Sequence, residues 1–188
     1  MKNRNVVFMV LVFMLALSIL SCGPKRDDSK EQAEDQNEDK FDGKMENDAE
    51  FAVEVAEGGM LEVRLGQLAQ ANSNSTQVKR FGQMMIDDHS KAGEELQNLA
   101  RTKNISLPAA LSEKCQKKYD DLAGKKGDDF DKAYSKLMVK DHEDDVDKFK
   151  KEGDKGRDAD LKSWAAGKVP TLEHHLQAAK ELDEVVRK

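Results

Sequence analysis

From residue 51 onward, apolar residues recur at alternating steps of three and four positions, which is the spacing of one face of an α-helix. The pattern divides into four long segments, at about residues 51–69, 75–104, 128–149 and 158–186. Each segment has a single apolar face, which a neighbouring helix must cover. The pattern therefore predicts an all-α domain over residues 50–188, folded as an antiparallel four-helix bundle.

Residues with strong positional preferences mark the ends of these segments. Ser75, Asp128 and Asp158 can each accept a hydrogen bond from the first turn of a helix, so we expect them to be N-caps. Asn104 is suited to end the second helix. Pro170 lies inside the last segment and lacks a backbone N–H, so we expect it to kink that helix or divide it in two.

A shorter amphipathic segment lies between the second and third long helices. Leu111, Cys115, Tyr119 and Leu122 fall on one side of it, and Ser112 is placed to cap it. We expect a short extra helix here that serves as a lid or a connector.

The N-terminus has the organisation of an export signal. A positively charged start precedes an apolar run over residues 6–20, which is shorter than the about 20 residues that a membrane-spanning helix needs. Ser21 and Cys22 follow and resemble the lipobox of bacterial lipoproteins, in which the cysteine is acylated before cleavage. We therefore expect residues 1–21 to be a lipoprotein signal peptide and Cys22 to carry lipid.

An ordinary secretory signal is the alternative, after which Cys22 could pair with Cys115, the only other cysteine of the chain. Such a bond would join a linker to a helix without burying apolar surface, so the lipid anchor is the better interpretation.

Residues 22–49 are dominated by charged and amide side chains, with Phe41 and Met45 as nearly the only apolar ones. A segment of this composition cannot bury enough apolar surface to fold. We expect a disordered acidic tether with a root-mean-square span of roughly 30 Å between the lipid and the domain. Asp27 and Asp28 also resemble the acidic export tags of some surface lipoproteins, although a solvated linker is the simpler explanation.

The acidic charge of the chain limits its partners. The net charge of −6 becomes −8 when Lys2 and Arg4 leave with the signal peptide. This charge argues against binding to nucleic acid and against adsorption on anionic lipid. We expect attachment to the outer membrane through the lipid on Cys22, with the domain in the periplasm or at the cell surface. The sequence identifies no protein partner.

Four motifs resemble a known bacterial family. They are Gly58 to Gly66, Met84 to Lys91, Met138 to Glu143 and Val169 to Leu176. In this order they resemble the domain-of-unknown-function family numbered four-one-four-two, over about residues 50–184. Its members are labelled outer membrane proteins and are predicted to be ferritin-like, so the resemblance implies that fold and says little about activity. Two histidines stand where the family has one, and by alignment His175 is the family position while His174 is extra.

Four polar residues interrupt the apolar faces, one on each long helix: Glu62, His89, His142 and His175. If all four point inward at a common level, a carboxylate and three imidazoles form a site for one transition-metal ion, such as iron, zinc, manganese or copper. The repeat of residues 85–89 (MIDDH) by residues 138–142 (MVKDH) indicates two duplicated hairpins, the arrangement of ferritin-like bundles.

Other interpretations of these residues stay open. Asp88, Asp141 and Glu173 adjoin the histidines and could orient their rings around a metal. Without a metal, Glu62 could accept hydrogen bonds from the imidazoles in a buried network, or some of these side chains could face solvent. A ferritin-type di-iron centre is less expected, because the Glu-x-x-His motif is absent from the second and third helices.

Methionine supplies one further alternative. Met85 and His89, like Met138 and His142, stand four residues apart on a helix, which would suit Cu(I). Packing of methionine in the core is the simpler interpretation.

The sequence contains no catalytic arrangement that would require an enzyme. It has no Ser-His-Asp order and no glycine-rich phosphate loop, and Cys115 has no evident activating neighbour. We expect a lipid-anchored envelope protein whose ferritin-like domain is a non-catalytic binding or stress-related module with one iron, zinc or copper ion. The alternatives are a metal-dependent redox enzyme or metal carrier, and a purely structural lipoprotein.

Overall fold

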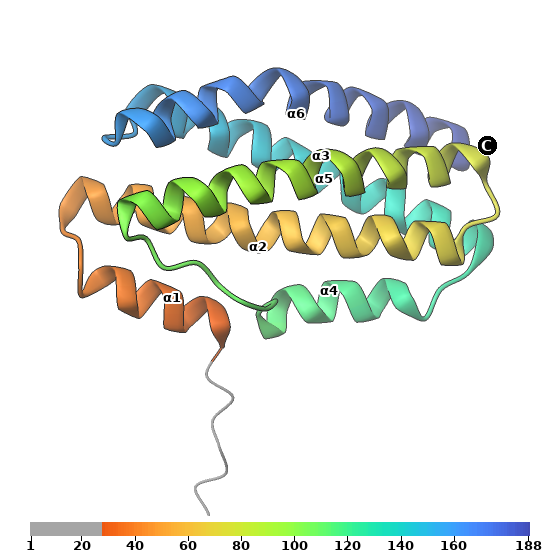
Figure 1. Cartoon of the computed structure of the whole chain (residues 1–188). Helices are drawn as coiled ribbons and strands as arrows, with labels where there is room; N and C mark the ends of the chain where they lie inside the picture. The colour runs from red at the N-terminus through yellow and green to blue at the C-terminus, as the bar shows by residue number, and fades with distance from the viewer. Residues whose placement is uncertain (1–27) are drawn as a thin grey trace, which may run out of the picture.

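Six α-helices make up the part of the chain that the structure describes, residues 28 to 188, in a computed structural model (Figure 1). They are α1 (Ser29–Glu38), α2 (Gly43–Asn72), α3 (Thr76–Lys103), α4 (Glu113–Ala123), α5 (Gly127–Lys155) and α6 (Ala159–Val186). This confirms the predicted all-helical bundle and the short extra helix. None of the helices in this part is both long and apolar enough to cross a membrane. The predicted signal peptide and Cys22 lie outside the described residues.

Two tight hairpins contain the four long helices, α2 with α3 and α5 with α6 (Figure 1). Ser75 caps α3 by accepting a hydrogen bond from the N–H of Val78. Asp158 caps α6 by accepting hydrogen bonds from the N–H groups of Asp160 and Leu161, two and three residues later. Both predicted caps are confirmed, and a left-handed Asn104 ends α3 as expected, with φ 57°.

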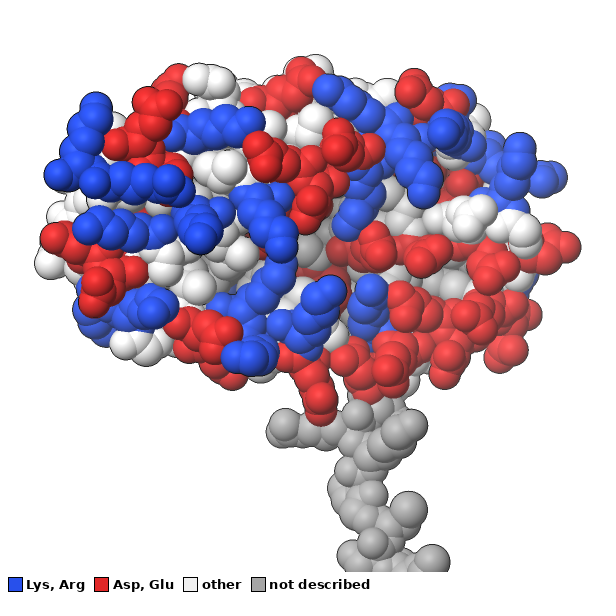
Figure 2. All heavy atoms as spheres, turned by 180° about the vertical axis from the view of Figure 1, so that it is seen from behind, with Lys and Arg blue, Asp and Glu red and all other residues white. Residues whose placement is uncertain are grey.

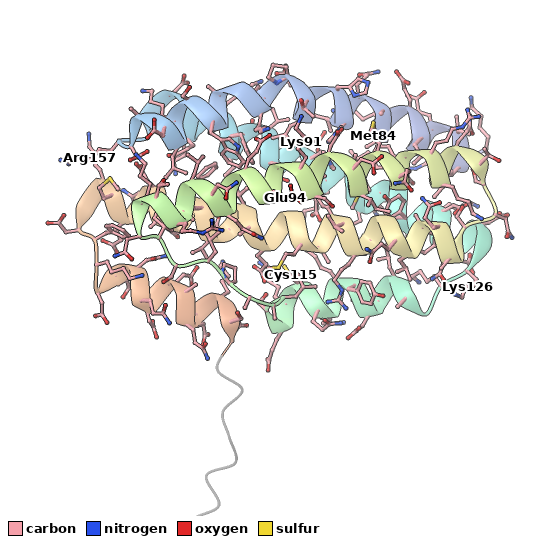
Figure 3. All side chains as sticks on the ribbon, in the orientation of Figure 1. Met84, Lys91, Glu94, Cys115, Lys126 and Arg157 are labelled. Carbon is pink, nitrogen blue, oxygen red and sulfur yellow. The ribbon has the colours of Figure 1, made fainter. Side chains whose placement is uncertain are left out.

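Side-chain contacts at the two ends of the bundle fix how the hairpins pair. Asp48, near the start of α2, accepts hydrogen bonds of 2.9 and 2.6 Å from the N–H groups of Arg157 and Asp158 in the α5–α6 turn. Asn72, at the end of α2, donates to the carbonyl of Lys125, just before α5. Arg157 and Lys126 lie at opposite ends of the bundle (Figure 3). Helices α2 and α5 therefore run side by side in opposite directions.

The connection from α3 to α5 has to traverse the bundle, because α3 ends and α5 begins at opposite ends of it (Figure 1). Its helix, α4, packs on α2. The Arg64 guanidinium of α2 lies 4.2 Å above the ring centre of Tyr119 and donates a 2.9 Å hydrogen bond to Gln116. The Ser112 side chain caps α4, as predicted.

The predicted disordered tether is wrong over residues 29–49. Part of this stretch forms α1, and α2 already begins at Gly43. Helix α1 is held by polar contacts: the Asn37 side chain exchanges hydrogen bonds of 2.9 and 2.7 Å with the backbone of Ser106, beyond α3. Because these contacts need no apolar residues, hydrophobic patterning does not reveal them. Acidic side chains gather at the end of the molecule where α1 lies (Figure 1 and Figure 2).

Two further local expectations are corrected. Helix α5 begins at Gly127, and the residue at its cap position is Lys126 rather than Asp128. Helix α6 continues through Pro170 and is not divided. Packing on both sides of the proline explains why the helix is not divided, since Ala165 and Leu172 lie in one apolar cluster with α5 residues and hold both halves against α5.

The buried apolar residues form zones with polar residues between them. On α5, His142 lies between Met138 of one zone and Val146 of another. On α6, His175 lies in the same way between Leu172 and Ala179. The bundle therefore has a polar layer near mid-length.

Glu152 gives stability a predictable pH dependence. Burial and the neighbouring Asp48 raise the pKa of this carboxyl to about 7, from 4.5. The protonated form thus favours folding, and its contribution is lost as pH rises from about 4.5 through 7. We expect Glu152→Gln to raise the free energy of unfolding by about 1 kcal/mol at pH 8 and to change it little at pH 5.

Urea unfolding at both pH values measures this effect. The exposed Glu184→Gln variant removes the same charge and is the control. An equal effect of the two substitutions at pH 8 would contradict the prediction.

Candidate metal centre

The structure brings the four polar residues together inside the bundle. Glu62 comes from α2, His89 from α3, His142 from α5 and His175 from α6, and all are buried. The three imidazole ring centres lie 5.4 to 5.7 Å from one another. The alternative that these side chains face solvent is therefore excluded.

Each imidazole has one nitrogen held by an acceptor. His89 Nδ1 lies 3.0 Å from Glu62 Oε2, His142 Nδ1 lies 2.9 Å from the carbonyl oxygen of Met138, and His175 Nε2 lies 2.8 Å from Asp88 Oδ2. Carbonyl and ionised carboxylate oxygens only accept hydrogen bonds, so the imidazole nitrogen is the donor in each pair. In a neutral ring, the other nitrogen then carries a lone pair.

These remaining nitrogens are buried and unpaired. His89 Nε2, His142 Nε2 and His175 Nδ1 have no hydrogen-bond partner among the described residues. One nitrogen of each ring lies within 4.8 Å of those of the other two rings. Nitrogens that bind a tetrahedral metal ion at about 2.0–2.1 Å are about 3.4 Å apart, so small inward shifts of the rings would bring them to ligand distance.

Glu62 occupies a different place from that of a fourth ligand. Its carboxylate lies on the Nδ1 side of His89, and its Oε1 is 3.5 Å from His142 Nδ1. The Glu62 carboxylate therefore faces Nδ1 of both rings, whereas the unpaired nitrogen of each of these two rings is Nε2. From this position it orients the His89 ring and counterbalances positive charge.

Of the three predicted orienting carboxylates, only Asp88 touches a histidine. Asp141 pairs with Lys118 at 2.9 Å, and Glu173 pairs with Lys150 at 2.7 Å. Both carboxylates are thus paired with lysines instead of histidines. The acceptor for His142 is the backbone carbonyl of Met138, four residues earlier, which no residue type in the sequence could have signalled.

The other sulfur- and imidazole-bearing candidates have different surroundings from those of the three buried histidines. His174 is exposed, unlike its neighbour His175. Met85 and Met138 are fully buried in one apolar cluster, as core packing predicts. Cys115 lies between α4 and α2 (Figure 3), and burial raises the pKa of its thiol, so it is not an activated nucleophile.

The electrostatics leave one histidine neutral. Burial lowers the pKa of His175 to about 4, against the opposing effect of Asp88. For His89, burial also favours the neutral ring, but the Glu62 carboxylate outweighs it and raises the pKa. Burial alone would raise the pKa of Glu62, yet the adjacent His89 and His142 lower it below its usual value. At neutral pH, Glu62 is therefore ionised and His175 is neutral.

A cleft of about 720 Å³ opens beside the centre. Glu62, His89 and His175 form part of its wall, whereas His142 does not line it. Most of the remaining lining comes from α2, α3, α6 and the segment 107–111, with Gln116 of α4 and Asp145 and Phe149 of α5. The candidate centre thus lies against a cleft on one side of the bundle.

Comparison with known proteins shows to which family the chain belongs. The family model described as domain of unknown function (DUF4142) matches residues 31–182. No curated protein and no solved structure matches the chain. The match covers most of the sequence, includes all four residues of the polar layer and confirms the resemblance found in the motifs, so the chain belongs to the DUF4142 family.

Proposed function

We propose that this protein binds one transition-metal ion through His89, His142 and His175. The observation that carries the proposal is the meeting of three buried imidazoles, each with one unpaired ring nitrogen and each offering a nitrogen within 4.8 Å of those of the other two. A buried polar atom without a partner costs about 1–3 kcal/mol, and one metal ion would satisfy all three at once.

The surroundings of the rings fit a metal site. Histidine ligands in proteins usually donate their other N–H to a carboxylate or a carbonyl, which fixes the tautomer and the ring orientation. Glu62, Met138 and Asp88 supply these acceptors. Three neutral imidazoles suit Zn²⁺, Cu²⁺ or Fe²⁺.

A hydrogen-bonded network without metal explains the arrangement less well. In such a network Glu62 should accept from the imidazoles around it, yet only His89 lies at 3.0 Å from its carboxylate. His142 is bonded to Met138 and His175 to Asp88 instead. The network would leave one nitrogen of every ring unsatisfied.

The location that we propose is the cell envelope. The export signal and Cys22 support a lipid anchor in the outer membrane, with the helical domain in the periplasm or at the cell surface. Two helical hairpins joined by one long crossover are also the arrangement of ferritin-like bundles, which often hold metal ions between their helices.

The cleft favours a second candidate function, a metal-dependent redox enzyme or a metal carrier. Structural metal sites are usually closed by four protein ligands, whereas catalytic sites have three protein ligands and an open position. Here three histidines converge, and two of them line a cleft that opens to solvent.

Metal titration tests the proposal. The protein to use is the mature chain from residue 22 with Cys22→Ser, which carries no lipid, purified without a histidine tag. We expect about one Zn²⁺, Cu²⁺ or Fe²⁺ per chain by elemental analysis. His142→Ala and His175→Ala should abolish stoichiometric binding, because each removes a ligand.

His174→Ala is the matched control, since it removes an adjacent but exposed histidine. Its metal content should equal that of the unsubstituted chain. Absence of stoichiometric metal in the unsubstituted chain, or full retention in His142→Ala, would refute the proposed function.

A further inference from the structure

We propose that the cleft beside the metal centre binds a small amphiphile, with an apolar body along the cleft and an anionic head at the metal ion. The position of the head rests on the proposed function, whereas the apolar part of the site does not depend on it.

The size and lining of the cleft suit such a molecule. Its volume of about 720 Å³ lies within the usual range of small-molecule sites, roughly 300–1,000 Å³. Apolar side chains from both walls line it: Val55, Met60, Val63, Leu96, Leu107 and Leu111. Burial of an alkyl or aryl body here removes apolar surface of both partners from water.

Three glycines keep space free in this cleft. Gly58 and Gly59 lie in the middle of α2 and Gly93 in the middle of α3, where glycine costs about 0.5–1 kcal/mol relative to alanine. A Cβ atom added to any of the three would meet no other atom within 4 Å. Close packing of helices therefore does not explain them, but room for a ligand does.

Another pair of glycines, in contrast, lies at a close contact between two helices. Gly66 and Gly82 lie where α2 and α3 touch, and a Cβ on Gly66 would be 2.5 Å from the Gly82 carbonyl oxygen. These two are explained by helix contact. The bundle thus uses glycine for two purposes, and only one of them is structural.

Two residues with unpaired ligand atoms lie in the wall of the cleft. His175 is 1% exposed and His89 is 9% exposed, both line the cleft, and each has a ring nitrogen without a partner. A metal ion held by these rings and His142 would be bound by imidazole nitrogens, while the carboxylates of Glu62 and Asp88 contact the other ring nitrogens of His89 and His175. Its open position would accept a carboxylate or a similar anionic oxygen donor from the cleft side.

The outer wall of the cleft is held in place. The N–H groups of Ala109 and Ala110 donate to Ser29 Oγ of α1, and the N–H of Ser112 donates to Glu57 at 2.7 Å. The segment 107–111 is therefore a fixed wall rather than an occupant of the cleft. A preformed site of this kind binds ligand without an ordering cost.

Dodecanoate is a suitable probe, and acetate is its comparator without an apolar body. Isothermal titration calorimetry is carried out on the mature chain with Cys22→Ser, with and without Zn²⁺. We expect dodecanoate to bind one per chain, about tenfold or more tightly with Zn²⁺ than without it, and acetate to bind far more weakly.

Leucine substitutions test the place of binding. Gly59→Leu and Gly93→Leu would fill the cleft from opposite walls and should weaken dodecanoate binding by about tenfold or more. Zinc affinity should stay within about twofold, which also shows that the variants are folded. Gly167→Leu is the control, because Gly167 is an exposed glycine of α6 outside the cleft with nothing near its Cβ position. It should change neither affinity.

Several results would overturn the inference. Dodecanoate binding that is absent in the unsubstituted chain, or unchanged in both leucine variants, would show that the cleft is not the site. Equal affinity with and without Zn²⁺ would refute the position of the head. If zinc itself does not bind, the proposed function fails, while dodecanoate binding that Gly59→Leu abolishes would still support the apolar site.

Discussion

Replacing Gly66 by alanine is expected to lower the free energy of unfolding by about 2–3 kcal/mol, whereas the same change at Gly93 should raise it by about 0.5–1 kcal/mol. An added Cβ at Gly66 meets the carbonyl oxygen of Gly82 at 2.5 Å, so α2 and α3 must separate. At Gly93 the added methyl group meets nothing within 4 Å, and only the better helix propensity of alanine remains.

Urea unfolding followed by circular dichroism measures both effects. Gly82→Ala should behave like Gly66→Ala, because its Cβ would lie 2.8 Å from that of Ala69 and 3.0 Å from the Gly66 carbonyl oxygen. Destabilisation of Gly93→Ala by a similar amount would mean that the cleft is closed by packing in solution, and would also count against the ligand site proposed there.

The glycines show what the hydrophobic pattern of the sequence cannot predict. Gly58 and Gly82 both stand at the three- and four-residue spacing of an apolar helix face, Gly58 between Val55 and Glu62 and Gly82 between Val78 and Met85. In the structure, Gly82 touches a neighbouring helix and Gly58 borders an open cleft. Helical period tells which face a residue occupies, but the distance to the next helix depends on the tertiary packing.

The polar layer was predictable because burial of charged groups is rare. A glutamate and three histidines on apolar faces, one per helix, predicted a common site, and the structure brings them together. Their hydrogen-bond partners were less predictable. Asp88 and Asp141 occupy equivalent positions in the repeated motif, yet Asp88 contacts a histidine and Asp141 pairs with Lys118 of α4.

Helix α1 is a second feature that the sequence did not predict. Asn37 is 3% exposed because the backbone around Ser106 satisfies its amide group. Composition gives no sign of this, since the same polar residues are typical of solvated linkers. The α3–α4 connection that receives α1 has no regular structure, and its free backbone groups cannot be located from sequence.

Zinc is expected to stabilise the folded domain by about 4 kcal/mol at pH 7.5, at a free concentration about 1,000 times its dissociation constant. The unfolded chain lacks the convergence of His89, His142 and His175, so binding favours the folded state. Circular dichroism during urea unfolding, with and without Zn²⁺, measures the difference. His174→Ala should leave it unchanged, and His142→Ala should remove it.

The same stabilisation should shrink at acidic pH, because metal binding needs neutral imidazoles. The raised pKa of His89 means that protons compete with zinc from above pH 6.5 downward, at about a tenfold loss of affinity per pH unit. His175, with a pKa of about 4, adds no competition until far lower pH. Between pH 7.5 and 5.5 we expect His89 alone to remove about 1.4–2.7 kcal/mol of the zinc effect.

In the metal-free protein, His89 should make the folded state more stable at acidic pH than at neutral pH. A pKa raised in the folded state contributes stability that is fully present below the unfolded value and is lost as pH rises through the folded one. Glu62→Gln keeps an acceptor oxygen for His89 but removes the charge that raises its pKa, so both pH dependences should weaken while zinc affinity falls by about 10- to 100-fold. A zinc effect that is constant from pH 7.5 to 5.5 would mean that the metal binds elsewhere, since no exchange of a proton for a metal ion at His89 could then be taking place.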